Sequence, residues 1–537
     1  MLKNQISGLR RLFRTIGASL AVAATGLALS QPVEAATRPA LAFLQYALVV
    51  GQERPGFKQF LGIRYAQPPV GPMRWKPPRP AGAAFGLLKA DAFAPHCPQK
   101  PSAFGTPSTN EDCLFLNVFA PRDAIPGSPY RPVMVWIHGG SLNEGESDDF
   151  DPTRLVGQGV VVVTINYRLG ALGFLAHPAL EAEGRPGVNY GLLDQQAALR
   201  WVRDNIAGFG GDPRNVTIFG QSAGAQSVLS HLVAPASRGL FARALGQSGA
   251  YSLILPTLAQ AQDRGTAFAA QAGCADQSAD CLRRLPVATV LANQGTGFRS
   301  TILDGTVLPE SIDTALAKGR FTRVPVLIGS NHDEGRAFVA GDFDLAGGPL
   351  TAAGYDAFVR SRLAAAADQI LGRYPLGGFA SPGLTLAAVE TDAIFSCNTL
   401  RAGAALARFT PVFQYEFSDE AAPQIFLPPV SFPYGAAHTS EVPYLFDRFV
   451  PPGNASESAP LSPGQRALSA SMVRYWTNFA KRGDPNGIGV PDWRRVGAGN
   501  AAIQSLAGSP KPTFGFATDH QCGFWTPIIS TQPLPLG

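Results

Sequence analysis

Short apolar runs recur through the middle of the chain and give the first indication of its fold. Each run is continuous rather than alternating and is rich in Val and Ile, as expected of parallel strands that are covered on both faces. The five clearest runs are Val133–Ile137, Val160–Ile165, Val216–Phe219, Val324–Ile328 and Val412–Tyr415. We therefore expect a central sheet whose strands are mostly parallel.

Helical patterns lie between these runs, and the clearest one is the segment Leu192–Asn205. In this segment apolar side chains such as Leu199 and Val202 alternate with polar side chains such as Asp194 and Arg203. Such a pattern is typical of a helix with one buried face. Strands that alternate with helices predict an α/β fold, in which helices flank the central sheet.

The composition is that of one large globular domain. Of the 537 residues, 45% are hydrophobic and only 15% are charged, and the chain contains 58 Gly and 46 Pro. These values are typical of a loop-rich globular protein and exclude a disordered, coiled-coil or collagen-like chain. Because no linker-like stretch divides the sequence, we expect a single large domain over residues 36–537.

The first residues of the chain have the pattern of an export signal. A basic segment precedes an apolar run over residues 16–30, and small residues occupy positions −3 and −1 of a cut after Ala35. This pattern predicts a signal peptide over residues 1–35 and a periplasmic or secreted protein. The pair Arg10-Arg11 resembles a twin-arginine signal, and an ordinary basic leader is the alternative.

Removal of the leader changes the charge and with it the expected partners. The formal net charge falls from +5 to about +2. A net charge this small, with no cluster of basic residues, does not form the basic surface that nucleic acid binds, so we expect no nucleic-acid partner. The apolar run of the leader is short and rich in Gly, Ala and Thr, so we also expect no stable membrane anchor.

The mature chain keeps six cysteines, and an even number in an exported protein indicates disulfide bonds. None of them shows the close spacing of a zinc site, so we expect no metal. Several pairings are possible from the sequence. Local spacing favours Cys97 with Cys113 and Cys274 with Cys281, which leaves Cys397 with Cys522.

The run Val216–Phe219 leads directly into Gly-Gln-Ser-Ala-Gly at residues 220–224, and a helical pattern follows. This strand–turn–helix context distinguishes a nucleophile elbow from a chance Gly-x-Ser-x-Gly. The turn holds the serine in an unfavourable backbone conformation, in which bulky neighbours would clash. Ser222 is therefore the candidate nucleophile, at the start of a helix whose dipole favours negative charge.

Other segments identify a family. They are 62–69 (Gly-Ile-Arg-Tyr-Ala-Gln-Pro-Pro), 111–114 (Glu-Asp-Cys-Leu), 166–170 (Asn-Tyr-Arg-Leu-Gly), 209–213 (Phe-Gly-Gly-Asp-Pro), 476–480 (Trp-Thr-Asn-Phe-Ala) and 483–486 (Gly-Asp-Pro-Asn). With the elbow, they resemble the carboxylesterase/cholinesterase family, the type-B carboxylesterases, across nearly the whole mature chain. The resemblance implies an exported bacterial carboxylic ester hydrolase with the α/β-hydrolase fold, and it matches the three favoured cysteine pairs.

The resemblance also assigns an oxyanion hole. His-Gly-Gly-Ser at residues 138–141 follows the first predicted strand and resembles the His-Gly-Gly-Gly loop of the family. Residue-by-residue matching places the oxyanion donors on the backbone N–H groups of Gly140, Ser141 and Ala223. Ser141 stands where a third glycine is usual, although serine keeps the N–H. The resemblance implies a structural role for His138.

The base and the acid are assigned in the same way. His438, at the end of Gly-Ala-Ala-His, resembles the family's base, and Glu334, in Gly-Ser-Asn-His-Asp-Glu-Gly, resembles the acid. The order Ser222, Glu334, His438 is the order of the α/β-hydrolase fold. With these residues the resemblance implies an acyl-enzyme on Ser222, with neither a metal nor an organic cofactor.

The neighbours of these residues leave alternatives. Asp333 is the rival acid because most α/β-hydrolases use Asp at this step. The glycine that follows Glu334, however, aligns the family motif so that its acid falls on Glu334. We therefore expect His332 and Asp333 to be solvated. Ser248 and Glu441 resemble positions close to the base, where they either hydrogen-bond or serve the fold alone.

Two departures from the cholinesterases bear on the substrate. The loop between Cys97 and Cys113 contains Phe104 but no Trp, and Gln221 stands where a glutamate is usual. Both changes weaken the case for a quaternary ammonium substrate. We therefore expect neutral or anionic carboxylic esters as substrates.

Two other functions are compatible with the same residues. An amidase or a lipase could use the same triad, although no large apolar lid is evident. Some relatives with this fold are non-catalytic adhesion proteins. This chain keeps Ser222, Glu334 and His438, which favours an enzyme.

Overall fold

A computed structural model of the chain describes residues 38–531, except for residues 128, 185–186, 448–459 and 498–502. The predicted leader over residues 1–35 and the predicted start of the domain lie outside the described residues. From Arg38 onward the chain forms one compact unit.

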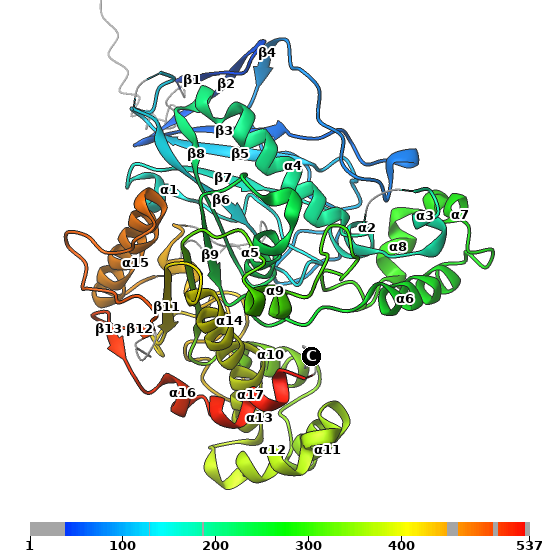
Figure 1. Cartoon of the computed structure of the whole chain (residues 1–537), viewed down its shortest axis with the longest axis vertical. Helices are drawn as coiled ribbons and strands as arrows, with labels where there is room; N and C mark the ends of the chain where they lie inside the picture. Colours follow the sequence, from blue (N-terminus) through cyan, green and yellow to red (C-terminus); the bar gives the residue numbers. More distant parts are fainter. Residues whose placement is uncertain (1–37, 128, 185–186, 448–459, 498–502, 532–537) are drawn as a thin grey trace, which may run out of the picture. The chain divides into compact units, whose positions relative to one another are not determined.

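A large sheet runs through this unit (Figure 1). Its strands are hydrogen-bonded in the order β1-β2-β3-β5-β7-β6-β8-β9-β10-β11-β12-β13, and β4 pairs with β2. The strands are β1 (Pro39–Phe43), β2 (Ala47–Arg54), β3 (Phe57–Arg64), β4 (Gly86–Lys89), β5 (Phe115–Pro121), β6 (Arg131–Ile137), β7 (Val161–Ile165), β8 (Gly211–Gln221), β9 (Arg243–Gln247), β10 (Val326–Asn331), β11 (Val412–Phe417), β12 (Ile503–Leu506) and β13 (Lys511–Thr513).

The centre of the sheet is parallel. Strand β6 pairs in parallel with β7 and β8, and β9 to β12 continue in the same direction. The five predicted runs coincide with β6, β7, β8, β10 and β11, which confirms the mostly parallel central sheet. Antiparallel pairs occur toward both edges, between β1, β2, β3, β5 and β7 and between β12 and β13.

Helices occupy most of the connections. They are α1 (Thr153–Val156), α2 (Gly170–Phe174), α3 (Pro178–Glu181), α4 (Tyr190–Asn205), α5 (Ala223–Val233), α6 (Leu258–Gln271), α7 (Ala279–Arg284), α8 (Val287–Asn293), α9 (Ile312–Lys318), α10 (Gly335–Val339), α11 (Ala352–Arg362), α12 (Ala367–Arg373), α13 (Pro382–Glu390), α14 (Cys397–Ala407), α15 (Pro463–Arg482), α16 (Phe516–Asp519) and α17 (Cys522–Ile529). The predicted helix over residues 192–205 is α4, which begins two residues earlier.

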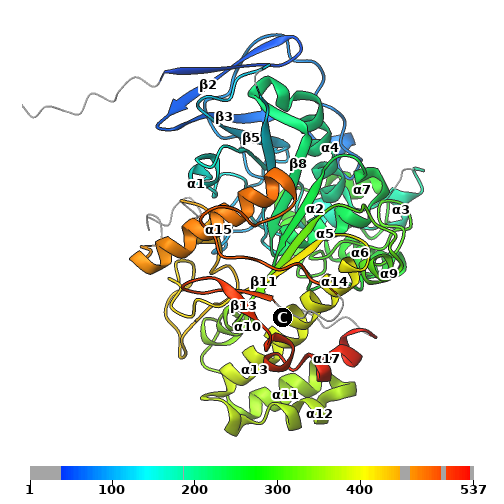
Figure 2. The same cartoon turned by 60° about the vertical axis from the view of Figure 1, so that its left-hand side comes forward.

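Alternate side chains of the parallel strands pack against different helices. On β6, Val133, Val135 and Ile137 share a core with α4 and α5, whereas Met134 and Trp136 share another core with α15. Because successive side chains of a strand point to opposite faces, helices cover both faces of the sheet. Figures 1 and 2 show α15 on one side of the strands and α4 on the other.

A third core lies among α10 to α14 and α17, at the opposite end of the unit from β1 to β4 in both views (Figure 2). A π-helical segment, Thr391–Ser396, joins α13 to α14 within it. The disulfide Cys397–Cys522 connects α14 to α17 in this core.

The other two disulfides are local. Cys97 is bonded to Cys113 and Cys274 to Cys281, so the structure contains the two pairs that local spacing favours and the third pair that they leave. In the part of the chain that is described, no helix is both long and apolar enough to cross a membrane.

Candidate active site

The chain turns sharply at Ser222, between β8 and α5. Ser222 has φ 56° and ψ −125°, and such a positive φ is strained for a residue with a side chain. A Cβ atom on Gly220 would lie 2.6 Å from the Ile137 carbonyl oxygen, and one on Gly224 would lie 1.9 Å from it. Both glycines are therefore required by the close approach of β6. The Ser222 N–H donates to the Gln247 carbonyl at 2.8 Å, which fixes the turn to β9.

The structure brings His438 and Glu334 together. Glu334 follows β10 and begins α10, and its Oε2 lies 2.5 Å from His438 Nδ1. Both side chains are buried. The rings of Phe338 and Phe395 have their centres 4.9 and 5.1 Å from that of the imidazole. Packing and hydrogen bonding together therefore set the orientation of the imidazole.

A side chain that the sequence analysis considered only for its charge occupies the other nitrogen of this imidazole. The Gln221 amide nitrogen lies 3.3 Å from His438 Nε2, and no hydrogen bond among the described residues joins Ser222 Oγ to His438. A ring hydrogen on Nδ1, facing Glu334, would leave Nε2 able to accept this amide N–H. A base that receives a proton from Ser222 needs this tautomer.

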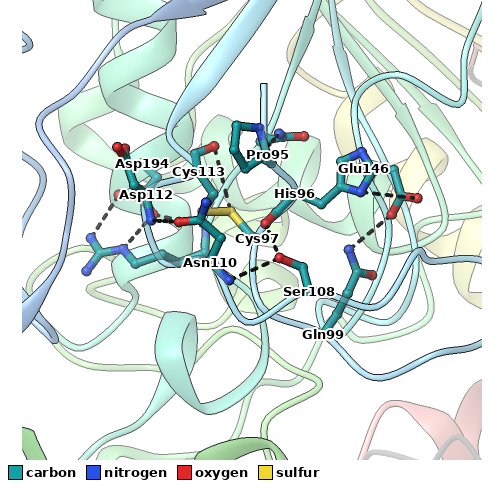
Figure 3. The surroundings of a disulfide bond; sticks show 12 residues. Pro95, His96, Cys97, Gln99, Ser108, Asn110, Asp112, Cys113, Glu146 and Asp194 are labelled. Atoms are coloured by element: carbon teal, nitrogen blue, oxygen red, sulfur yellow. Dashed lines mark hydrogen bonds and ion pairs between the residues drawn. A yellow bond between two sulfur atoms is a disulfide. The ribbon is translucent and has the colours of Figure 1, made fainter. Parts of the chain in front are cut away.

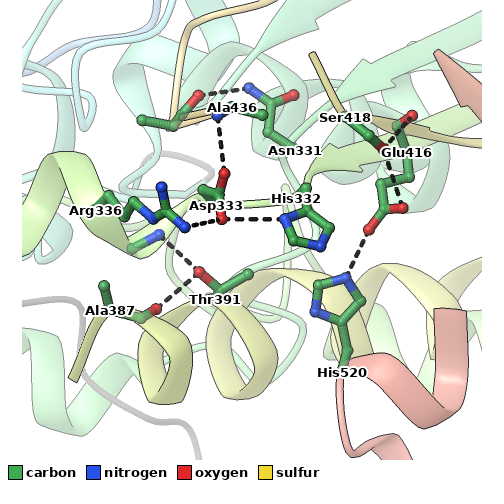
Figure 4. Close-up of polar contacts among 12 residues, drawn as sticks. Asn331, His332, Asp333, Arg336, Ala387, Thr391, Glu416, Ser418, Ala436 and His520 are labelled. Atoms are coloured by element: carbon green, nitrogen blue, oxygen red, sulfur yellow. Dashed lines mark hydrogen bonds and ion pairs between the residues drawn. The ribbon is translucent and has the colours of Figure 1, made fainter. Parts of the chain in front are cut away.

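The carboxylate of Asp333, the rival acid, points to Ala436, Arg336 and His332 (Figure 4). Its Oδ2 accepts from the Ala436 N–H at 2.9 Å, and its own N–H donates to the Ala436 carbonyl at 3.0 Å. Its Oδ1 pairs with Arg336 at 2.9 Å and with His332 at 3.0 Å. The expectation that Asp333 is solvated is wrong: it is 6% exposed, because it holds the loop that carries His438.

The surroundings set the charge of Asp333. Burial favours its neutral form, but the hydrogen bond from His332 and the charge of Arg336 outweigh burial and hold the pKa of Asp333 below its ordinary value. The hydrogen bond to Asp333 in turn raises the pKa of His332, against the effect of burial. Asp333 is therefore a charged part of the scaffold.

A second buried carboxylate lies behind Glu334. Asn331, at the end of β10, connects the two: its N–H donates to Glu334 Oε1 at 2.8 Å and its amide nitrogen donates to Glu441 Oε2 at 2.7 Å. Burial and the charge of Glu334 raise the pKa of Glu441. Glu441 thus contacts the acid through Asn331, whereas Ser248 Oγ has no hydrogen-bond partner among the described residues. The sequence analysis missed Asn331, whose position at a strand end was the only signal.

The predicted oxyanion loop lies against the elbow. A Cβ atom on Gly139 would lie 3.1 Å from Ser222 Cβ. Gly140 and Ser141 have φ 91° and 54°, so the serine adopts the glycine-like backbone of this position. Ala223 is the first residue of α5 and its N–H has no partner within the helix. Among the described residues, no backbone hydrogen bond uses the N–H groups of Gly140, Ser141 or Ala223.

The disulfide loop contacts the segment that follows the oxyanion loop, and Figure 3 shows Gln99 beside Glu146. Gln99, two residues after Cys97, accepts the Gly145 N–H at 2.7 Å and donates to Glu146 Oε2 at 3.0 Å. The sequence analysis did not identify Gln99. The Cys97–Cys113 bridge therefore helps to hold a segment that shapes the site.

His138 has the surroundings of a structural residue. Burial lowers its pKa to about 4, and its ring stacks on Tyr167 with 4.4 Å between the ring centres. Its Nδ1 lies 2.9 Å from the Gly139 carbonyl oxygen. His138 therefore stays neutral and packs within the oxyanion loop.

Comparison with known proteins places this geometry in a family. The sequence profile of the carboxylesterase family matches residues 40–525. The chain belongs to the carboxylesterase family. Fumonisin B1 esterase of Sphingopyxis macrogoltabida is 36% identical over 457 residues, which cover 81% of each chain.

Two further comparisons agree. Para-nitrobenzyl esterase of Bacillus subtilis (strain 168) is 35% identical over 467 residues, which cover 82% of this carboxylesterase and 90% of that protein. A solved structure of a thermophilic PNB esterase has a TM-score of 0.76 at 32% identity, covering 90% of this chain and 99% of the other. This carboxylesterase is therefore a carboxylic ester hydrolase with the α/β-hydrolase fold.

A cavity of about 1090 Å³ opens over the elbow of this carboxylesterase. Ser222, His438 and the oxyanion loop line it, and so do Arg264 and Arg299. Phe104 of the disulfide loop and Phe426 also line it, with 5.5 Å between their ring centres. The cavity thus combines the candidate chemical groups with an aromatic wall and cationic side chains.

Proposed function

We propose that the enzyme hydrolyses neutral or anionic carboxylic esters through an acyl-enzyme on Ser222, with His438 as base and Glu334 as orienting acid. The observation that supports this assignment most directly is the 2.5 Å contact between Glu334 Oε2 and His438 Nδ1, beside a strained Ser222 in one cavity. The family and its esterase relatives supply the reaction class, and the geometry supports the proposed roles of these residues.

The first half-reaction forms the acyl-enzyme. Ser222 Oγ attacks the carbonyl carbon while His438 Nε2 takes its proton, and Glu334 stabilises the imidazolium. The carbonyl oxygen becomes an oxyanion that accepts hydrogen bonds from the N–H groups of Gly140, Ser141 and Ala223. When the tetrahedral intermediate collapses, the C–O bond to the alcohol breaks and the imidazolium protonates the departing oxygen.

The second half-reaction restores the enzyme. His438 takes a proton from water, whose oxygen attacks the acyl carbon. Collapse then breaks the bond to Ser222 Oγ, which recovers its proton from the imidazolium. In both halves, Nε2 must exchange its hydrogen bond from Gln221 for one from the attacking hydroxyl, so substrate entry is accompanied by a change at this contact.

The decisive experiment removes the nucleophile. Ser222→Ala should lower kcat for a chromogenic ester by about 10⁵-fold or more, because both half-reactions need the hydroxyl, while the exposed Ser361→Ala serves as the matched control and keeps wild-type activity. A fluorophosphonate probe should label the wild type and not the Ser222→Ala protein. Undiminished hydrolysis by Ser222→Ala would exclude the mechanism, and absence of labelling in the wild type would favour a binding protein.

We also propose that the protein is exported and that residues 1–35 are removed. The three disulfides support an oxidising compartment. N-terminal sequencing of the protein recovered from the periplasm or medium should begin at Ala36, and an intact N-terminus would contradict the proposal. If the protein stays inside the cell when Arg10 and Arg11 are both replaced by Lys, its export uses the twin-arginine route. If export of this variant is normal, the protein uses the general secretory route.

A further inference from the structure

Among the described residues, two arginines on the cavity wall form no ion pair with a carboxylate. Arg264 lies on α6 and Arg299 lies in the connection between α8 and α9, and both line the cavity that contains Ser222. Within the described residues neither guanidinium forms an ion pair or donates a hydrogen bond, and Arg299 Nε is buried without a partner. Burial lowers the pKa of Arg264. An unpaired cation in such a place is costly, so a complementary anion would stabilise it.

Core packing places the two arginines on one wall. Phe298, next to Arg299, meets Phe268 of α6 edge-on with 5.5 Å between the ring centres, and both rings are buried. Phe268 is one helical turn beyond Arg264 on α6. A Cβ atom on Gly297 would lie 3.7 Å from Arg264 Cδ. The arginine positions are therefore fixed relative to each other before any ligand arrives, which lowers the entropic cost of binding.

Two carboxylates of the cavity, Glu144 and Asp342, do not occupy the guanidinium donors of Arg299. Glu144 and Asp342 lie close enough to Arg299 for its charge to lower their pKa values, but burial outweighs this effect and raises both. Neither carboxylate hydrogen-bonds to Arg299 among the described contacts. Asp263, on α6, is exposed. The Nη–H groups of Arg299, unlike its buried Nε–H, thus remain available to a ligand.

The position beside the nucleophile carries no negative charge. The side chain beside the nucleophile is the neutral amide of Gln221, which points at His438. No carboxylate at that position repels a negatively charged substrate. The guanidinium group binds carboxylates with two parallel hydrogen bonds and charge attraction, a match that a neutral side chain lacks.

We propose that the enzyme prefers esters that retain a free carboxylate, and that Arg299, assisted by Arg264, binds this carboxylate while Ser222 attacks the ester. This inference rests on the proposed function and narrows its substrate class to carboxylate-bearing esters, such as monoesters of dicarboxylic acids. Arg299 is in this view a specificity residue, and it takes no part in proton transfer.

The test compares two esters of equal length. The 4-nitrophenyl monoester of adipic acid and 4-nitrophenyl hexanoate differ only in replacing a terminal methyl by a carboxylate. We expect wild-type kcat/KM to be higher for the adipate monoester. Arg299→Gln should lower the ratio of the two kcat/KM values about tenfold or more, mainly through KM, because a charge-assisted pair is lost.

The controls separate this inference from the proposed function. The exposed Arg214→Gln, at the other end of β8 from Ser222, should leave the ratio unchanged, and the Arg264→Gln/Arg299→Gln double variant should lower it further. A wild type that hydrolyses both esters but does not prefer the adipate monoester, or an unchanged ratio in the double variant, would overturn the inference alone. A wild type that hydrolyses neither ester would instead count against the proposed function.

Discussion

At the scale of single residues, the contact between Gln221 and His438 defines the resting state of the site. The amide holds Nε2 at 3.3 Å, while Glu334 holds Nδ1. The imidazole is thus in contact at both nitrogens before substrate binds. Positions fixed in this way lower the reorganisation required in the transition state.

The pair Glu334 and Asp333 provides a direct test at this scale. Glu334→Gln should reduce kcat about 10³-fold or more, because an amide cannot stabilise the imidazolium as a carboxylate does. Asp333→Asn should reduce kcat less than about tenfold and lower the stability by about 1 to 3 kcal/mol, because Asp333 bonds to the Ala436 N–H and pairs with Arg336. Steady-state kinetics and urea unfolding of both variants check this ranking, and the reverse order in kcat would move the acid to Asp333.

The sequence suggested candidate site residues where a motif surrounds them. Ser222, Glu334 and His438 each lie in a short recognisable segment, and the structure brings Glu334 against His438. Asn331 and Gln99 carry no such signal. Their importance comes from contacts between segments far apart in the chain, such as Asn331 with Glu441 and Gln99 with Gly145, and local pattern does not contain these contacts.

At the scale of elements, the site depends on the close approach of β6, β8 and α5. We expect Gly224→Ala to prevent folding or to destabilise the protein by about 3 kcal/mol or more, because its Cβ would lie 1.9 Å from the Ile137 carbonyl oxygen. Gly523→Ala, in α17, is the matched control: its Cβ would meet nothing within 4 Å, and alanine favours helix. Thermal unfolding compares the two, and a Gly224→Ala protein as stable as the control would contradict the packing.

Strands and helices were predictable where their composition strongly favours one kind of secondary structure. The central strands are rich in Val and Ile because both of their faces are covered, and their runs were recognisable for this reason. Strand β9 (Arg-Ala-Leu-Gly-Gln) lies between β8 and β10 in the same sheet but has no β-branched residue. Its strand conformation follows from its neighbours rather than from its own composition, so the sequence did not indicate it.

At the scale of the whole molecule, the buried His520 connects the C-terminal helices to the sheet through two carboxylates. His520 follows α16, and its ring nitrogens lie 2.6 Å from Asp392 Oδ1 and 2.7 Å from Glu416 Oε1 of β11. Burial opposes its charged form, but these two carboxylates raise the pKa of His520 from 6.5 to about 10. Figure 4 shows His520 beside Glu416.

This raised pKa predicts how stability depends on pH. The imidazolium stabilises the folded state fully below pH 6.5, and its contribution is lost as the pH rises toward 10. His520→Gln should destabilise the protein by about 3 to 5 kcal/mol near neutral pH, because it leaves two buried carboxylates without their cation. Urea unfolding of wild type and variant should show a gap that narrows from pH 6.5 to 10. A gap independent of pH would mean that His520 is not protonated in the folded protein.

The Cys397–Cys522 bridge has a consequence for the order in which the molecule is completed. Its two cysteines are 125 positions apart, and Phe395, which packs on the His438 ring, lies two residues before Cys397. During synthesis, the elbow and the acid leave the ribosome long before Cys522 does. The disulfide that holds the Phe395 side of the His438 pocket can therefore form only after Cys522 has been made, and it needs an oxidant. We therefore expect the pocket around His438 to be completed after the turn that carries Ser222.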